Sequence, residues 1–91
     1  MSIIYIKQQH SLGREETRQK VEEIAKGLKK EYRINYAWKG DRLQFKRSGA
    51  TGFLGLGNGV VEVKIKLGLI LAPLKGNIET AIKKNMAEEL S

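Results

Sequence analysis

Ninety-one residues, no cysteine and a formal net charge of +7 limit what this chain can be. A chain of this length forms one small domain, residues 1–91, which buries only about 60–65% of the surface exposed by its unfolded chain. A second domain and a large internal ligand cavity are therefore excluded. Without cysteine there is neither a disulfide framework nor a thiolate metal site, which fits a reducing compartment. The excess of basic over acidic residues favours polyanions or anionic surfaces as partners.

No stretch of the sequence approaches the ~20 apolar residues that are needed to cross a bilayer. Residues 1–11 also lack the basic start and the long apolar region of a signal peptide. We therefore expect a soluble, cytoplasmic protein.

The first element in chain order is a short run rich in β-branched residues, residues 2–9. Ile4 and Ile6 fall on one face of this run, and Ile3 and Tyr5 fall on the other. Because both faces are apolar, the sequence predicts a strand that is covered on both sides.

An amphipathic helix is predicted next, over residues 12–32. Ser11 stands where a side-chain N-cap would, and His10 is expected to pack beside it. Apolar residues recur at three- and four-residue spacing, which indicates one stripe turned toward a core. The stripe consists of Thr17, Val21, Ile24, Ala25, Leu28 and Tyr32.

Four strands are predicted after this helix, as one antiparallel meander. Apolar residues alternate with polar ones, and turn signals separate the runs, among them residues 39–42 and an Asn58–Gly59 pair. The residues predicted to point inward are Ile34, Tyr36, Trp38, Leu43, Phe45, Leu54, Leu56, Val61, Val63, Ile65 and Leu67.

A second helix closes the chain, with Pro73 in its first turn, where a missing N–H is harmless. Its buried stripe is predicted to be Leu74, Ile78, Ala81, Ile82 and Met86. Both helices must cover the same face of the sheet, because the other face carries Lys39, Gln44, Lys46, Glu62, Lys64 and Lys66. The fold class is therefore α+β: a two-layer sandwich of an antiparallel sheet under two helices, in the order strand, helix, four strands, helix.

Residues 67–74, LGLILAPL, contain no charge although the chain is highly charged elsewhere. If Leu67 points inward, Leu69 and Leu71 are expected to continue inward, which leaves Ile70 and its neighbours without a place in the core. Two interpretations remain open. Either the second helix or another subunit covers this strand end, or the run is a functional apolar surface.

Three stretches carry a resemblance to a known family: HSL at residues 10–12, WKGDRLQFKRSG at 38–49 and VEVKIKLGLILAPLKGNIE at 61–79. They closely resemble the small bacterial polyhydroxyalkanoic acid system proteins, which are encoded near polyester-granule genes. The resemblance covers nearly the whole chain. It implies a role around storage polyester, with the granule surface or a granule protein as the partner.

The sequence offers little for catalysis. His10 is the only histidine and Asp41 the only aspartate, whereas a hydrolase triad needs a base that is held by a carboxylate beside a nucleophile. Zinc sites need clustered ligands, which are absent from the sequence. We expect a protein that is not an enzyme and that has no catalytic, metal or cofactor site.

Glycines are frequent in residues 52–59, but the loop leads from one strand into another. A phosphate-binding loop leads into a helix N-terminus instead. Turn and bulge geometry is therefore the expected role of these glycines.

Nucleic acid is an alternative partner, because basic residues gather on the predicted outer face and hairpin. A sheet that binds single strands also needs outward aromatic side chains. Tyr36, Trp38 and Phe45 are predicted to face the core, which leaves Phe53 as the outward candidate. The candidate anion contacts are Lys39, Arg42, Lys46, Arg47, Lys64, Lys66 and Lys75.

A small binder of acyl or lipid-type ligands is a further alternative, by analogy of architecture. Its second helix would fill the sheet and leave little of the ~300 Å³ that ligand pockets need. The resemblance instead implies a non-enzymatic accessory protein of polyhydroxyalkanoate metabolism, and we expect it to associate with the granule surface. Its candidate contact surface is Leu69, Ile70, Leu71, Ala72, Pro73 and Leu74.

Overall fold

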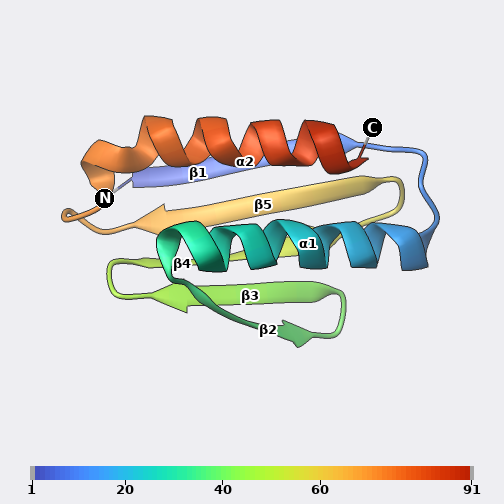
Figure 1. Ribbon diagram of the computed structural model, residues 1–91, viewed down its shortest axis with the longest axis horizontal. Helices are drawn as coiled ribbons and strands as arrows, with labels where there is room; N and C mark the ends of the chain where they lie inside the picture. The colour runs from blue at the N-terminus through green and yellow to red at the C-terminus, as the bar shows by residue number, and fades with distance from the viewer. Residues whose placement is uncertain (1, 91) are drawn as a thin grey trace.

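The computed structural model describes residues 2–90 (Figure 1). In chain order its elements are β1 (Ser2–Gln9), α1 (Arg14–Tyr32), β2 (Asn35–Lys39), β3 (Arg42–Arg47), β4 (Ala50–Leu56), β5 (Val60–Leu67), the 3₁₀ turn η1 (Ala72–Leu74) and α2 (Lys75–Leu90). This order confirms the predicted one.

All neighbouring strands of the sheet are antiparallel, in the spatial order β1-β5-β4-β3-β2. The four later strands form the predicted meander, and β1 joins it beside β5, with Ile4 opposite Ile65. Helix α1 therefore carries the chain from one edge of the sheet to the other. Gly40, Gly49 and Gly59 have φ angles of 61°, 86° and 69° in the three hairpin turns, where a side chain would be strained.

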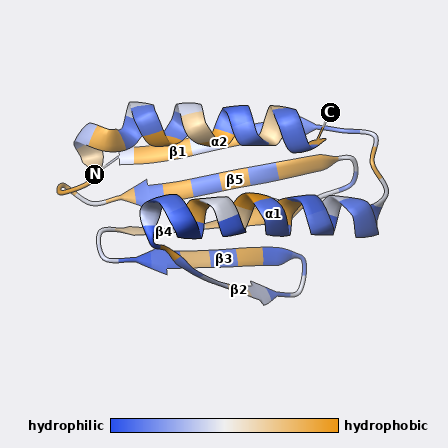
Figure 2. Ribbon diagram, in the orientation of Figure 1, coloured by the Kyte–Doolittle hydropathy of each residue, from blue (hydrophilic) through white to orange (hydrophobic). Residues whose placement is uncertain are grey.

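Both helices lie on the same face of the sheet and run antiparallel to each other, so the α+β sandwich is confirmed (Figure 1). Hydrophobic stretches of the helices and strands alternate with hydrophilic ones, as one-sided burial requires (Figure 2). Fully burying a branched aliphatic side chain contributes about 1.5–3 kcal/mol. The largest fully buried side chains are Ile4, Ile24, Leu43, Leu54, Leu67, Ile82, Met86, Val21, Val61 and Val63.

The first strand is not covered on both sides, contrary to the prediction. Ile3 is 49% exposed and Tyr5 is 52% exposed, because both point to the face of the sheet that lies away from the helices. The side chain period of a strand places alternate residues on opposite faces, and only one of the two faces has a second layer. The apolar character of Ile3 and Tyr5 therefore has no explanation in the core.

The start of α1 also differs from the prediction, since Ser11 is not its N-cap. The cap position is Gly13, and no side chain bonds to the free N–H groups from that position. Instead the Leu12 N–H donates to Nδ1 of His10, and the Thr17 hydroxyl donates to the Gly13 carbonyl at 2.7 Å. The helix begins two residues later than expected because residues 10–13 form this separate turn.

The start of the second helix is displaced too. Pro73 lies in the 3₁₀ turn η1, and the α-helix begins only at Lys75. Leu74 is consequently 40% exposed, and its predicted place in the buried stripe is wrong. The residues of α2 that are buried are Ile78, Ile82, Met86 and Leu90.

Candidate functional site

The chain makes a fixed turn directly after β5, at residues 68–71. The Gly68 N–H donates to the Gly49 carbonyl at 2.8 Å, and the N–H groups of Leu71 and Ala72 donate to the Gly68 carbonyl at 3.2 and 3.0 Å. The Leu71 side chain is only 8% exposed. It packs against Gly49, where a Cβ would lie 3.3 Å from the Cδ1 of Leu71. The turn is therefore held by the backbone on one side and by a core side chain on the other.

The two residues at the head of this turn are the most exposed large hydrophobic residues described. Leu69 is 82% exposed and Ile70 is 86% exposed. Glycine, asparagine, aspartate and serine are the usual turn residues, so two large aliphatic side chains at this position need another explanation. Figure 2 shows the loop between β5 and α2 as a hydrophobic projection at one end of the molecule. We call Leu69, Ile70, Pro73 and Leu74 the apolar tip.

Only some residues of the predicted contact surface, residues 69–74, are exposed. Leu69 points out although it was expected to point in, because β5 ends at Leu67 and Gly68 turns the chain away from the sheet. Leu71 belongs to the core, and Ala72 is half-buried. Ile70 is not covered by α2, so the interpretation in which the second helix buries this residue is wrong.

A second surface is the face of the sheet that lies away from the helices, which we call the open face. Strand register places its side chains in rows across the sheet. One row joins Tyr5, Lys64, Phe53, Gln44 and Ala37. The row on one side is Ile3, Lys66, Thr51, Lys46 and Asn35, and the row on the other side is Lys7, Glu62, Gly55, Arg42 and Lys39.

Five of the predicted anion contacts lie on the open face, and all five are exposed: Lys39, Arg42, Lys46, Lys64 and Lys66. Arg47 does not. It is half-buried, and its Nη1 donates to the Tyr32 carbonyl at 2.7 Å, at the end of α1. Lys75 begins α2 and is also half-buried.

The sequence prediction missed one basic and one aromatic residue of the open face, Lys7 and Tyr5. The alternation of residues 2–9 already placed Tyr5 opposite to Ile4 and Ile6. The error was to assume a second covering layer, so Tyr5 was not counted among the outward aromatic residues.

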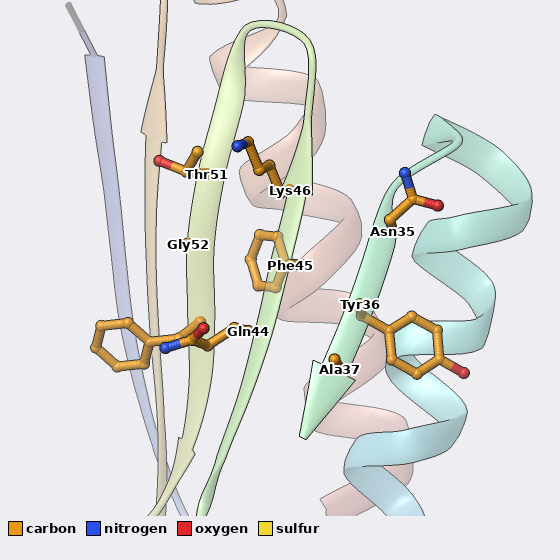
Figure 3. A pocket seen from close by; sticks show the side chains of 9 residues that line it. Asn35, Tyr36, Ala37, Gln44, Phe45, Lys46, Thr51 and Gly52 are labelled. Atoms are coloured by element: carbon orange, nitrogen blue, oxygen red, sulfur yellow. The ribbon is translucent and has the colours of Figure 1, made fainter. Parts of the chain in front are cut away.

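A hollow of about 520 Å³ lies over strands β2, β3 and β4 and is open to solvent. Its lining includes Asn35, Gln44, Lys46, Thr51 and Phe53. The close-up shows Tyr36 turned away toward α1 (Figure 3). The hollow is therefore mainly apolar, and Lys46 is the one basic residue among those that line it.

A smaller, apolar hollow of about 40 Å³ lies inside the fold between Leu28, Phe45, Leu67 and Ile82. Ligand pockets usually measure about 300 Å³ or more. An acyl ligand would have to displace core side chains to enter there.

Other chemistry has little geometric support in residues 2–90. No group of three or more histidine, cysteine, aspartate or glutamate residues is placed to hold a metal ion in that range. His10 uses Nδ1 to accept the Leu12 N–H, while its buried Nε2 has no partner. Among the helices described, none is long and apolar enough to cross a membrane.

Comparison with known families gives one finding. The family model described as "putative polyhydroxyalkanoic acid system protein" matches residues 4–90. Searches of curated proteins and of solved structures found no match. Because the match spans both helices and the five strands, this chain belongs to the polyhydroxyalkanoic acid system protein family.

Proposed function

We propose that this protein is a non-enzymatic accessory protein of polyhydroxyalkanoate storage that binds the surface of the cytoplasmic polyester granule through its apolar tip. The observation that carries the proposal is the exposure of Leu69 and Ile70 at the head of a fixed turn. Membership of the polyhydroxyalkanoic acid system protein family supports storage polyester as the apolar material that the tip contacts.

The fixed turn favours binding. A flexible loop would lose conformational entropy when it inserts, whereas a turn already held by Gly49 and Leu71 loses little. Fully burying one such aliphatic side chain contributes about 1.5–3 kcal/mol. Two or three of them support a reversible association that can be strengthened when many copies bind one granule.

Charged residues flank the tip without entering it. Lys66 precedes the tip on the open face and is exposed, while Lys75 follows it at the start of α2. Lysine stems can lie along an apolar surface while the ammonium group stays in water. Both residues are therefore suited to the boundary between polymer and water.

Co-sedimentation with native polyester granules tests the proposal. Ile70→Glu introduces a charge at the tip, whereas Gln19→Glu adds the same charge at an exposed position of α1. We expect Ile70→Glu to lower the granule association constant at least tenfold and Gln19→Glu to bind like the wild type. Both should keep the wild-type circular dichroism, because Ile70 is 86% exposed.

Salt provides the second criterion. Apolar contacts persist when exposed charges are screened, so wild-type binding should survive 0.5 M NaCl. Equal binding by Ile70→Glu and wild type, or release of the wild type by salt, would contradict the proposal.

A further inference from the structure

The positive charge of this protein is concentrated on the open face. Six basic side chains point from that face, and Glu62 is its single acidic one. The basic residues are Lys7, Lys39, Arg42, Lys46, Lys64 and Lys66. Since the whole chain has a formal net charge of +7, the helices contribute little of it.

The basic groups of the open face are not held in ion pairs within the described residues. All four ion pairs found in residues 2–90 involve α1 or α2, as in Lys20 with Glu89 and Lys83 with Glu79. No ion pair of the described residues includes a basic residue of the open face. Exposed and unpaired charges of one sign attract a polyanion and add little to folding.

Two aromatic side chains stand among these charges, one on either side of Lys64. Tyr5 and Phe53 are both register partners of Lys64, so their strands are two spacings, or about 10 Å, apart. Tyr5 is 52% exposed. Neither ring is needed to fill the core, which lies on the opposite face of the sheet.

Contacts on the open face hold both aromatic residues in position. The Tyr5 hydroxyl donates to Oε2 of Glu62 at 2.5 Å, which occupies the one carboxylate of this face. The Arg42 guanidinium lies over the Phe53 ring, 4.3 Å from its centroid. Bases stack on aromatic rings and on arginine planes alike, so this pair presents a flat platform.

We propose that the open face binds single-stranded nucleic acid, with bases stacked on Tyr5 and on the Arg42–Phe53 pair and with phosphates bound by the surrounding lysines. The row with both rings runs through the middle of the face, and basic residues occupy the rows on both sides of it. Sequence-tolerant binding of single strands uses the same combination of stacking and backbone charge. The hollow beside Phe53 gives room for a further base next to Gln44 and Thr51.

A polyanion without bases would use only part of this surface, because it has nothing to stack on Tyr5 or Phe53. A paired duplex keeps its bases stacked on each other and likewise leaves the rings unused. Inorganic polyphosphate and duplex DNA are therefore the comparisons that separate this proposal from simple charge attraction.

Fluorescence anisotropy with a labelled single-stranded 15-mer, in 50–300 mM NaCl, measures the binding. Lys46→Gln/Lys64→Gln removes two charges from the open face, and Lys30→Gln/Lys84→Gln removes two exposed charges from the helices. We expect the first pair to weaken binding at least tenfold at 50 mM salt. The slope of log K against log salt should fall by about 1.4, since each phosphate contact in a single strand contributes about 0.7. The helix pair should change neither quantity appreciably.

Tyr5→Leu and Phe53→Leu test the stacking while keeping an apolar side chain at each position. Each should weaken binding of the single strand about fivefold or more, without changing the salt slope. Polyphosphate of equal charge and the duplex should compete less well than the unlabelled single strand. Circular dichroism checks that the variants remain folded.

Several results would overturn the proposal: no binding at 50 mM salt, equal losses from the helix pair and the open-face pair, or unchanged affinity in both leucine variants. Tighter binding of polyphosphate or of anionic vesicles than of the single strand would do the same. Ile70→Glu should bind the 15-mer like the wild type, so this proposal and granule association fail or succeed separately.

Discussion

The backbone N–H of Leu12 donates to Nδ1 of His10 at 3.1 Å, so the single histidine of the chain closes the turn that leads into α1. Ser11, which lies between them, is exposed and is not the cap of the helix. The backbone of His10 takes part as well, because its N–H donates to the Gly59 carbonyl at 3.0 Å, at the end of the β4–β5 turn. The sequence predicted that Ser11 caps α1, whereas in the structure it is the His10 side chain that accepts a backbone N–H at this turn.

Replacing His10 with alanine should destabilise the protein by about 1 kcal/mol, since a local side-chain acceptor for a backbone N–H at a helix entry contributes about that much. His10→Asn keeps a side-chain acceptor and should recover part of the loss. Ser11→Ala should stay within about 0.5 kcal/mol of the wild type. Urea unfolding followed by circular dichroism measures all three, and a larger loss for Ser11→Ala than for His10→Ala would contradict the assignment.

Substitution by alanine should change the stability of the protein very differently at two glycines of β4, Gly52 and Gly55. At Gly52 a Cβ would lie 2.2 Å from the Lys64 carbonyl oxygen, which the backbone of β5 holds in place. At Gly55 the nearest atom is a Phe53 ring carbon at 3.5 Å, an ordinary contact. We expect Gly52→Ala to cost about 2 kcal/mol or more, because the strands must separate.

Gly55→Ala is the matched control, in the same strand and with the same substitution. It should be neutral or slightly stabilising, since alanine loses less conformational entropy than glycine on folding. Thermal melting of the two variants decides the point. Similar losses in both would show that β4 has no close approach at Gly52.

Arg47 should stabilise the end of α1. Its Nη1 donates to the Tyr32 carbonyl at 2.7 Å, and a cation near the last carbonyls of a helix also interacts favourably with the helix dipole. Arg47→Met keeps the apolar stem and removes the hydrogen bond, so we expect a loss of about 1–2 kcal/mol. Arg47→Ala should lose more, because the stem packs beside the small hollow near Leu71 and Ile78. An unchanged stability of Arg47→Met would show that the bond to the Tyr32 carbonyl does not stabilise the end of α1.

Alternation along strands was enough to predict which side chains of β3, β4 and β5 enter the core. Leu43, Leu54 and Val63 are each fully buried, as their parity required. The helix stripe of α1 was predictable for the same reason, since residues such as Val21 and Ile24 repeat at helical spacing. Both patterns can be recognised within a short stretch of sequence, and they require only that one side of the strand or helix is covered.

The errors occur where a pattern ends or where its covering layer is not local. Leu69 follows Leu67 at strand spacing, but β5 ends at Leu67. The next residue is a glycine, and its N–H donates to the Gly49 carbonyl in the β3–β4 turn. Tyr5 has the parity of an outward residue, and only the placement of both helices on one face shows that nothing covers it. Both candidate surfaces therefore depended on tertiary information that no sequence window contains.

The indole N–H of Trp38 donates to Oε1 of Glu22 at 2.8 Å, which ties the edge strand β2 to α1. Hydrogen bonding from Tyr36, and next from Trp38, lowers the pKa of Glu22 from its usual value of 4.5 against the opposing effect of burial. The folded state thus favours the ionised carboxylate more than the unfolded chain does. Glu22 therefore contributes stability above about pH 4.5, and this contribution is lost as the pH falls through the lower pKa of the folded state.

Glu22→Gln separates the charge from the hydrogen bond, because the amide oxygen can still accept from Trp38. We expect the melting temperature of Glu22→Gln to lie below that of the wild type at pH 7. The gap should shrink as the pH falls below about 4.5, where Glu22 is protonated first in the unfolded chain and then, at its lower pKa, in the folded state. Glu16→Gln, at an exposed position of the same helix, serves as the control and should follow the wild type closely at pH 7. A difference in melting temperature that stays constant from pH 7 to pH 3 would contradict this prediction. It would mean that the charge of Glu22 does not help to hold β2 against α1.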